Sequence, residues 1–251
     1  MEQHRNPVIL GIWQQFPLPM ISRLLGLQGW DWVILDMQHG SANIETAYEC
    51  MHTLHAAGTR PLLRTSVDVP SEVQRALDLG ALGVIVPMVN DVDQARAVAR
   101  AAKYPPLGCR SVGSDLPWHY GKDYYETANQ RTLLLVQIEH IDAVNQVEQI
   151  MAVPGVDGCF IGPTDLALSM GLPRTGYEDD ESHRAAIART LAASHAHGKL
   201  ACCNTYSMSD AETRAAAGFD GITFMSEADF FVGAGTSLLA KLRERTIGEA
   251  S

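Results

Sequence analysis

Four apolar stretches of this sequence run directly into polar residues that are suited to shared chemistry. These residues are Asp36 and His39, then Arg64, then Gln137 and Glu139, and finally Gly162, Pro163, Thr164 and Asp165. Two carboxylates close to an amide, with no thiolate beside them, are the hard oxygen ligands that Mg²⁺ or Mn²⁺ prefers. We therefore predict that Glu139 and Asp165 hold a divalent metal ion, with coordination positions left open for a substrate.

The same residues indicate the kind of substrate. Pro163 is a favourable first residue for a short helix, which would leave the backbone N–H groups of Thr164 and Asp165 free to bind a carboxylate. A metal ion next to such groups favours a chelating anion such as a 2-oxo acid. Arg64 would place positive charge near a developing enolate, and His39, oriented by Asp36, would move a proton near neutral pH. Together these groups suit enolate chemistry.

Each of these residues also has a purely structural interpretation. Asp165 is a favourable charge for the first turn of a helix, Arg64 is a typical ion-pair partner, and His39 is a typical buried imidazole. Trp13 ends an apolar stretch and is, by residue type, more often part of a core than of a binding site. The functional interpretation depends on all of them meeting at one rim of the fold.

A lysine-based mechanism is not favoured. A Schiff base needs a lysine that projects into the site, and the sequence has only Lys103, Lys122, Lys199 and Lys241. Two of these fall in predicted helices, one in a long loop and one at the start of a predicted strand. The Gly-Ala-Gly segment at residues 233–235 is compatible with phosphate binding, but it is more often a simple turn.

Short apolar runs alternate with longer segments of helical periodicity along the whole chain. The runs are typical of parallel strands buried on both faces and lie at residues 8–13, 32–37, 61–65, 83–88, 133–138, 158–161, 200–204 and 221–224. The predicted helices lie at residues 19–27, 44–57, 71–79, 92–103, 143–152, 181–197, 209–217 and 237–245. Eight such units in 251 residues predict a (β/α)8 TIM barrel that forms a single domain over residues 1–251.

A doubly wound sheet is the competing fold, but no linker divides the chain into two domains. In a TIM barrel the chemistry lies at the C-terminal ends of the strands, which is where the polar residues above are expected. The longest connection, residues 104–130, is rich in proline, glycine and aromatic residues and is interpreted as a functional loop.

Composition excludes several classes of protein. Apolar residues make up 46% and charged residues 19% of the chain, which is typical of a globular domain with a core. A net charge of −10 argues against nucleic acid and anionic membranes as partners. The five cysteines are odd in number and form no CxxC pair, and no signal peptide or membrane span is evident. We therefore expect a cytoplasmic protein that acts on small molecules.

Several segments resemble those of a known family. The segments are DMQHG at 36–40, ALDLGA at 76–81, VPMV at 86–89, YPPLGCR at 104–110, QIE at 137–139 and FIGPTDL at 160–166. In combination they are similar to the HpcH/HpaI family of metal-dependent, class II pyruvate aldolases. The resemblance extends over most of the chain and implies a TIM barrel that uses Mg²⁺ or Mn²⁺, with Co²⁺ as an alternative.

The resemblance also implies a role for individual residues. Glu139 and Asp165 match the metal ligands, His39 and Asp36 match a proton-transfer dyad, and Arg64 matches an enolate-stabilising arginine. The matched substrate-binding positions are Trp13, Arg64, Gln137, Gly162, Pro163, Thr164 and Asp165. Asp78 matches a carboxylate that reaches the active site of a neighbouring subunit. Family members are typically homohexamers, built as trimers of dimers that exchange the C-terminal helix.

The resemblance implies cleavage of 4-hydroxy-2-oxo acids to an aldehyde and pyruvate, or a close analogue such as hydroxypyruvate. Two alternatives stay open, namely a decarboxylase of 2-oxo diacids such as oxaloacetate and a non-catalytic protein that binds oxo acids. The second is suggested by Gln38, which stands where the family usually has glutamate. Residues 115–120 also depart from the family pattern, and His119 and Tyr120 would either contact the aldehyde or pack within the loop.

Overall fold

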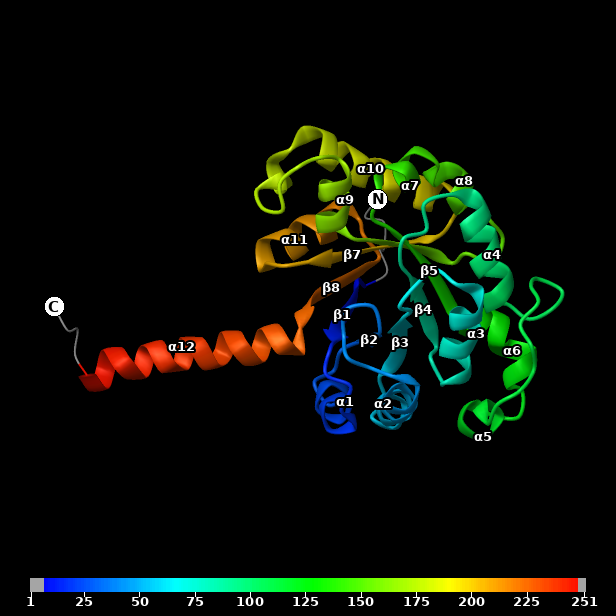
Figure 1. The fold of residues 1–251 in the computed structure, drawn as a ribbon, viewed down its shortest axis with the longest axis horizontal. Helices are drawn as coiled ribbons and strands as arrows, with labels where there is room; N and C mark the ends of the chain where they lie inside the picture. Colours follow the sequence, from blue (N-terminus) through cyan, green and yellow to red (C-terminus); the bar gives the residue numbers. More distant parts are fainter. Residues whose placement is uncertain (1–6, 248–251) are drawn as a thin grey trace.

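The computed structural model describes residues 7–247, and within them eight strands close into a parallel barrel (Figure 1). Each strand pairs with the next in the sequence, and the last pairs with the first. The strands are β1 (Ile9–Gln14), β2 (Trp32–Asp36), β3 (Arg60–Arg64), β4 (Gly83–Val86), β5 (Leu133–Ile138), β6 (Gly158–Ile161), β7 (Leu200–Thr205) and β8 (Gly221–Ser226). The predicted TIM barrel is therefore confirmed.

Helices alternate with the strands as expected, and all but the last of them lie around the barrel (Figure 1). They are α1 (Pro19–Gly26), α2 (Ile44–Ala56), α3 (Pro70–Asp78), α4 (Val92–Ala102), α5 (Leu116–Tyr120), α6 (Tyr124–Arg131), α7 (Ile141–Asn145), α8 (Val147–Met151), α9 (Pro163–Ser169), the 3₁₀ helix η1 (Tyr177–Asp179), α10 (Glu181–Ala196), α11 (Met208–Ala217) and α12 (Glu227–Ile247). The helix expected at 143–152 is divided into α7 and α8 at Gln146. No helix in the described part of the chain is long and apolar enough to cross a membrane.

The apolar strand residues divide between two cores, as the period of two in a strand requires. In β2, Trp32 and Ile34 lie in the cluster inside the barrel, whereas Val33 and Leu35 belong to the cluster between barrel and helices. The Trp32 indole fills the lower part of the barrel so tightly that a Cβ on Gly11 would lie 1.8 Å from its Nε1 atom. A glycine at position 11 is therefore needed to accommodate Trp32.

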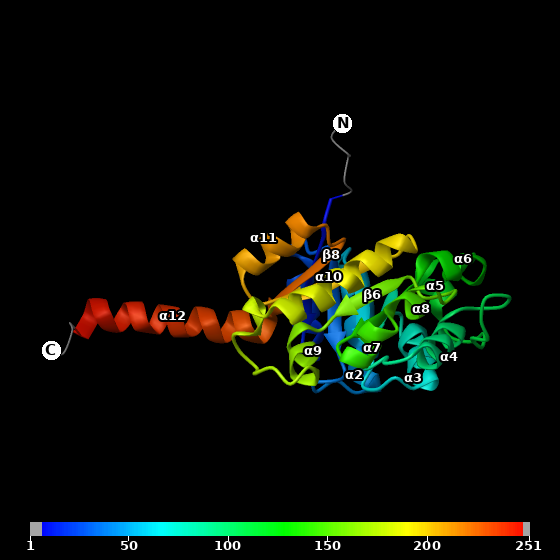
Figure 2. The same cartoon turned by 90° about the horizontal axis from the view of Figure 1, so that it is seen from above.

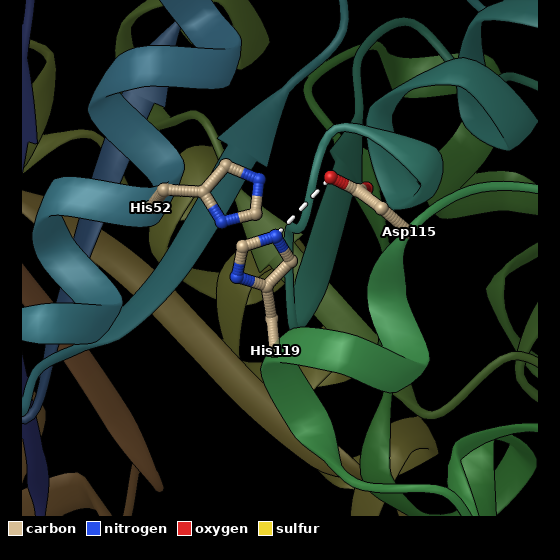
Figure 3. Close-up of side chains that lie close together, drawn as sticks. All are labelled: His52, Asp115 and His119. Atoms are coloured by element: carbon tan, nitrogen blue, oxygen red, sulfur yellow. Dashed lines mark hydrogen bonds and ion pairs between the residues drawn. The ribbon is translucent and has the colours of Figure 1, made fainter.

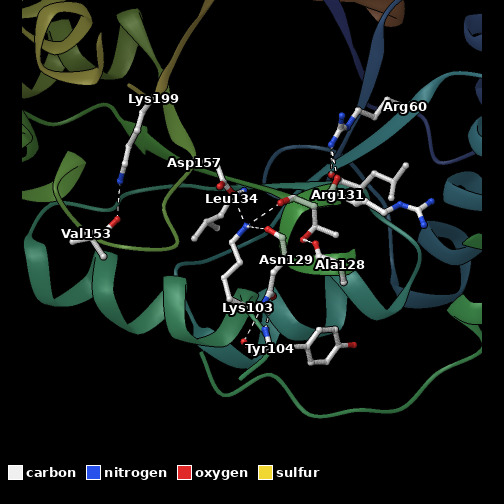
Figure 4. A network of polar contacts seen from close by, with 12 residues as sticks. Arg60, Lys103, Tyr104, Ala128, Asn129, Arg131, Leu134, Val153, Asp157 and Lys199 are labelled. Atoms are coloured by element: carbon white, nitrogen blue, oxygen red, sulfur yellow. Dashed lines mark hydrogen bonds and ion pairs between the residues drawn. The ribbon is translucent and has the colours of Figure 1, made fainter. Parts of the chain in front are cut away.

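A network of polar contacts closes the N-terminal ends of β5 and β6 (Figure 4). The buried Lys103 Nζ donates to the Asp157 carboxylate at 2.7 Å and to the carbonyls of Thr132 and Asn129 at 2.9 and 3.3 Å. Lys199 Nζ donates to the Val153 carbonyl at 2.7 Å. These lysines therefore hold loops together at the end of the barrel opposite to the predicted chemistry.

The long connection over residues 104–130, interpreted from the sequence as a functional loop, is partly helical. It contains α5 and α6, and the ring of Tyr120 is buried in a small core with Tyr104 and Tyr124. The Tyr120 hydroxyl donates to the Gly80 carbonyl, which precedes β4. This contact places the segment beside the N-terminal ends of the strands, because aromatic side chains supply it with a core of its own.

Helix α12 extends away from the barrel, and Figures 1 and 2 both display it as a projecting arm. It begins ten residues before the predicted helix at 237–245, because Ser226 and Asp229 cap its first turn reciprocally. Residues 233–235 lie inside this helix, so they form neither a turn nor a phosphate loop. From Asp229 to Thr246 the helix is exposed along its whole length.

Candidate active site

A cavity of about 300 Å³ lies at the C-terminal ends of the strands. It follows from the alternation inside the barrel, since in several strands an interior apolar residue is followed two positions later by a residue that lines the cavity. The pairs are Ile34 and Asp36 in β2, Leu62 and Arg64 in β3, Leu135 and Gln137 in β5, Phe160 and Gly162 across the end of β6, and Cys202 and Asn204 in β7. A polar layer therefore covers the apolar interior of the barrel.

Asp36 and Arg64 form a bidentate ion pair at one side of this cavity. Arg64 Nε and Nη2 donate to the two Asp36 oxygens at 2.9 and 2.6 Å, and both side chains are largely buried. The Arg64 guanidinium also lies 4.4 Å from the centre of a Trp13 ring, whose Nε1 donates to Asn204 at 2.8 Å. The arginine is therefore held between a carboxylate and an aromatic face.

His39 is exposed and lines the cavity. The Asp36 carboxylate accepts the backbone N–H groups of Gln38 and His39, at 3.0 and 3.2 Å. In the described residues, Asp36 is thus bonded to the main chain of His39 and not to its ring. Asp36 therefore fixes the turn that presents the imidazole, while its charge is matched by Arg64.

Glu139 lies directly behind the cavity wall. Its Oε1 atom accepts the Met88 backbone N–H at 2.8 Å, and its Oε2 atom accepts the Gln137 side-chain amide. A Cβ on Gly162 would lie 2.9 Å from Glu139 Oε2 and 3.1 Å from Gln137 Nε2. Glycine at position 162 therefore lets the next strand end approach the buried carboxylate.

Helix α9 begins at Pro163 directly after this glycine, as the sequence predicted. The first N–H groups of a helix have no carbonyl partner within it, so those of Thr164 and Asp165 stay available. The Thr164 hydroxyl is 2.8 Å from that of Tyr177, and the buried His183 ring donates to the Pro163 carbonyl at 2.9 Å. These contacts hold the start of α9 at the cavity.

The charges around Glu139 fit a divalent cation. Burial raises the pKa of Glu139, and the nearby Asp165 charge raises it further, while the Met88 N–H and Arg64 act in the opposite direction. Gln137 Oε1 is buried and has no hydrogen-bond partner in the described residues. Two carboxylates that repel each other beside an unpaired amide oxygen form the all-oxygen donor set that suits Mg²⁺ or Mn²⁺.

Residues 10–227 match the family model described as HpcH/HpaI aldolase/citrate lyase. The chain belongs to this family. It is accordingly a lyase of the aldolase class, and the family resemblance read from the sequence motifs is confirmed.

Relatives in the HpcH/HpaI family match most of this chain. A hydroxypyruvate/pyruvate aldolase of Rhizorhabdus wittichii is 33% identical over 239 residues, which cover 95% of each chain. A 4-hydroxy-2-oxo-heptane-1,7-dioate aldolase of Escherichia coli is 35% identical over 76% of this chain and 73% of its own. The crystal structure of a family protein from Burkholderia cenocepacia J2315 superposes with a TM-score of 0.87 at 29% identity, covering 94% of this chain and 95% of its own.

The cavity brings together most of the predicted site residues of this family member. Those that line it are Trp13, Asp36, His39, Arg64, Gln137, Gly162, Thr164 and Asp165. Glu139 and Pro163 lie just behind the wall through the contacts described above. Asp78 is not brought to the cavity, because it ends α3 and pairs with the buried Arg110 at 2.8 Å. No lysine is among the residues that line the cavity in the described part of the chain.

Half of the residues that line the cavity were not predicted from the sequence. The additional residues are Gln15, Phe160, Arg174, Asn204, Tyr206, Met225, Ser226 and Asp229. Asn204 could have been found, because it ends the predicted seventh strand at 200–204. Ser226 could have been found as well, because it follows the predicted eighth strand at 221–224 by two residues. Arg174 had no such signal, since it comes from the loop after α9.

Proposed function

We propose that this protein cleaves 4-hydroxy-2-oxo acids reversibly to an aldehyde and pyruvate, or a close analogue such as hydroxypyruvate. The observation that supports this most is the electrostatic proximity of Glu139 to both Asp165 and Arg64 beside one cavity. The names of the two aldolase relatives support the same class of substrate.

Glu139 and Asp165 would hold the divalent cation, which is Mg²⁺ or Mn²⁺, with Co²⁺ as an alternative. When bound, it supplies Lewis-acid polarisation of the 2-oxo group. The free N–H groups of Thr164 and Asp165 bind the substrate carboxylate. Gln137 lies at the same wall, where its unpaired Oε1 atom can accept a hydrogen bond.

Arg64 stabilises the negative charge that develops on the enolate oxygen. The Asp36 carboxylate holds the Arg64 guanidinium on one side, and the Trp13 ring holds it on another. The guanidinium therefore needs to move little during the reaction. Asp36 is therefore a positioning residue for Arg64 and for the main chain at His39.

His39 moves the proton. In the cleavage direction its ring takes the proton of the 4-hydroxyl group, the C3–C4 bond breaks, and the electron pair passes into the 2-oxo group to give the enolate. The aldehyde leaves, and a proton added at C3 completes pyruvate. The exposed position of His39 at the cavity mouth suits this exchange of protons with solvent.

Decarboxylation of a 2-oxo diacid is the second reaction that this site suits, because it forms the same enolate without removing a hydroxyl proton. His39→Ala should lower aldol cleavage about 100-fold, in line with general base catalysis, and should spare oxaloacetate decarboxylation. An equal loss in both reactions would contradict this role for His39.

We also propose that the chain forms a homo-oligomer in which α12 is exchanged between subunits, with the hexamer as the expected assembly. The arm exposes the large apolar side chains Phe231, Val232, Leu238, Leu239 and Leu242. Such an apolar helix surface is stabilised by burial against a partner. Asp78 would then act at the site of a neighbouring subunit.

The substrate proposal is tested by following pyruvate release from a 4-hydroxy-2-oxo acid. Wild type should be active with Mg²⁺ or Mn²⁺ and inactive with a chelator, whereas Glu139→Gln and Asp165→Asn should each lose about 100-fold or more. Glu212→Gln removes an exposed carboxylate on α11 and should keep full activity. Full activity of both site variants in chelated buffer would overturn the proposal.

A further inference from the structure

Three side chains with metal-binding atoms meet between α2 and α5, on the outside of the barrel (Figure 3). His52 comes from α2, Asp115 directly precedes α5, and His119 lies within α5. One potential ligand atom from each residue lies within 4.8 Å of the others. None of the three lines the candidate active site, so the cluster is separate from it.

The spacing of these atoms approaches that of a tetrahedral zinc site. Bond lengths near 2.0–2.1 Å to zinc give an edge of about 3.3 Å between ligand atoms. The His119 Nε2 and Asp115 Oδ2 atoms are 3.2 Å apart, and the ligand atom of His52 lies within 4.8 Å of both residues' ligand atoms. The separations between ligand atoms, which are at most 4.8 Å, exceed the tetrahedral edge by no more than about 1.5 Å. Rotation of the His119 side chain can close this difference, because that side chain is 34% exposed.

His52 is an unpaired polar group. Both of its ring nitrogens are buried and lack a hydrogen-bond partner among the described residues. A buried polar atom without a partner is destabilising, and a ligand would remove this cost.

Asp115 is oriented toward the same point. It occupies the residue before α5, yet its side chain does not cap that helix. Its Oδ2 atom instead accepts the Tyr48 hydroxyl at 2.7 Å and contacts His119. A hydrogen bond from a neighbouring side chain to a carboxylate ligand is a usual feature of metal sites, where it fixes the ligand's orientation.

We propose that His52, Asp115 and His119 bind a divalent cation of the Zn²⁺ type that fastens α5 to α2. Two imidazoles and one carboxylate leave a fourth position for water, and imidazole ligands favour Zn²⁺ over Mg²⁺. Glu139 and Asp165 at the cavity offer only oxygen atoms, which favour Mg²⁺ or Mn²⁺, so the two sites select different metals. This inference does not depend on the proposed function.

Co²⁺ is the probe for the test, because four-coordinate Co²⁺ absorbs intensely in the visible range and six-coordinate Co²⁺ on oxygen ligands does not. The full chain, with excess Mg²⁺, should develop this absorption with one equivalent of Co²⁺. His52→Ala and His119→Ala should each abolish it, while His197→Ala, at an exposed histidine after α10, should retain it. A wild-type protein without the absorption, or a His119→Ala variant that keeps it, would overturn the proposal.

Two further measurements separate a metal site from a folding effect. Tyr48→Phe should weaken Co²⁺ binding about tenfold without removing the spectrum, since it deletes only the hydrogen bond to Asp115. Zn²⁺ should raise the Tm of wild type but not that of His119→Ala, whose far-UV circular dichroism should match wild type. An equal rise in both proteins would contradict the assignment.

Discussion

Asp36 and Arg64 are direct partners in the register of β2 and β3, and their side chains form a bidentate ion pair at the edge of the cavity. The sequence suggested two separate duties, with Asp36 orienting the His39 ring and Arg64 facing the enolate. The register joins them, because both side chains point inward at the same level of neighbouring strands. Arg64 is therefore an ion-pair partner and also a residue that lines the cavity, so the structural and the functional interpretation of this residue are compatible.

Asp36→Asn should impair both activity and stability. The change leaves a largely buried guanidinium without its counter-charge, which should cost about 3 kcal/mol of unfolding free energy. It should also lower kcat for aldol cleavage, because Arg64 loses its fixed position. Denaturant unfolding and steady-state kinetics measure the two effects, and an unchanged kcat would show that Arg64 needs no positioning by Asp36.

Gly162→Ala should weaken metal binding in the cavity about tenfold or more. The new Cβ would lie 2.9 Å from Glu139 Oε2, so the buried carboxylate has to shift. Titration with Mn²⁺ measures the affinity directly. Gly171→Ala is a useful comparison, because position 171 has open space around it and any cost there comes from its positive φ alone. Equal Mn²⁺ affinity in wild type and Gly162→Ala would contradict the assignment of Glu139 as a ligand.

His183 should make the protein less stable in mild acid. Burial lowers the pKa of His183, and the nearby charge of Arg214 lowers it further. The hydrogen bond to the Pro163 carbonyl raises the pKa, but it does not outweigh these two effects. Below about pH 6.5 the unfolded chain therefore binds a proton that the folded chain does not, so stability falls as pH falls, by at most about 1.4 kcal/mol per pH unit. His183→Gln should flatten this dependence. Urea unfolding between pH 5 and pH 7 measures how the unfolding free energy of each protein depends on pH. An identical dependence in wild type and His183→Gln would refute this role of His183.

Lys103→Met should destabilise the fold without changing the chemistry. It removes the cation that is bonded to Asp157 and two carbonyls, and the loss of this donor should cost about 2 kcal/mol, because the Asp157 side chain is partly exposed. Arg96→Ala breaks an exposed pair with Asp93 and should cost about 0.5 kcal/mol or less. Thermal unfolding compares the stability of the Lys103→Met and Arg96→Ala variants. A Lys103→Met variant as stable as wild type would mean that the polar network contributes little to the stability of the fold.

The barrel could be predicted from the sequence because its strands are buried on both faces and appear as continuous apolar runs. Most of the predicted residues that line the cavity followed from the rule that chemistry lies at the strand ends, whereas Asp78 was named only from the family resemblance. The Asp36–Arg64 pair could not be predicted, since it depends on strand register, which no single run of residues specifies.

The errors have equally local causes. The glycines at 233 and 235 suggested a break, but the capping of α12 by Ser226 and Asp229 and the helix formers around them outweigh that preference. The segment at 104–130 was interpreted as a functional loop, because it is rich in proline, glycine and aromatic residues. Its aromatic residues instead form a core of their own, which brings His119 to His52.

Proton NMR of pyruvate in deuterated water shows whether this cavity forms an enolate from a 2-oxo acid with the help of a divalent metal. We expect the methyl signal to disappear when the protein and Mg²⁺ or Mn²⁺ are present, and to persist with a chelator or with Glu139→Gln. A methyl signal that persists with wild type under every metal, or that disappears equally in chelated buffer, would contradict this expectation.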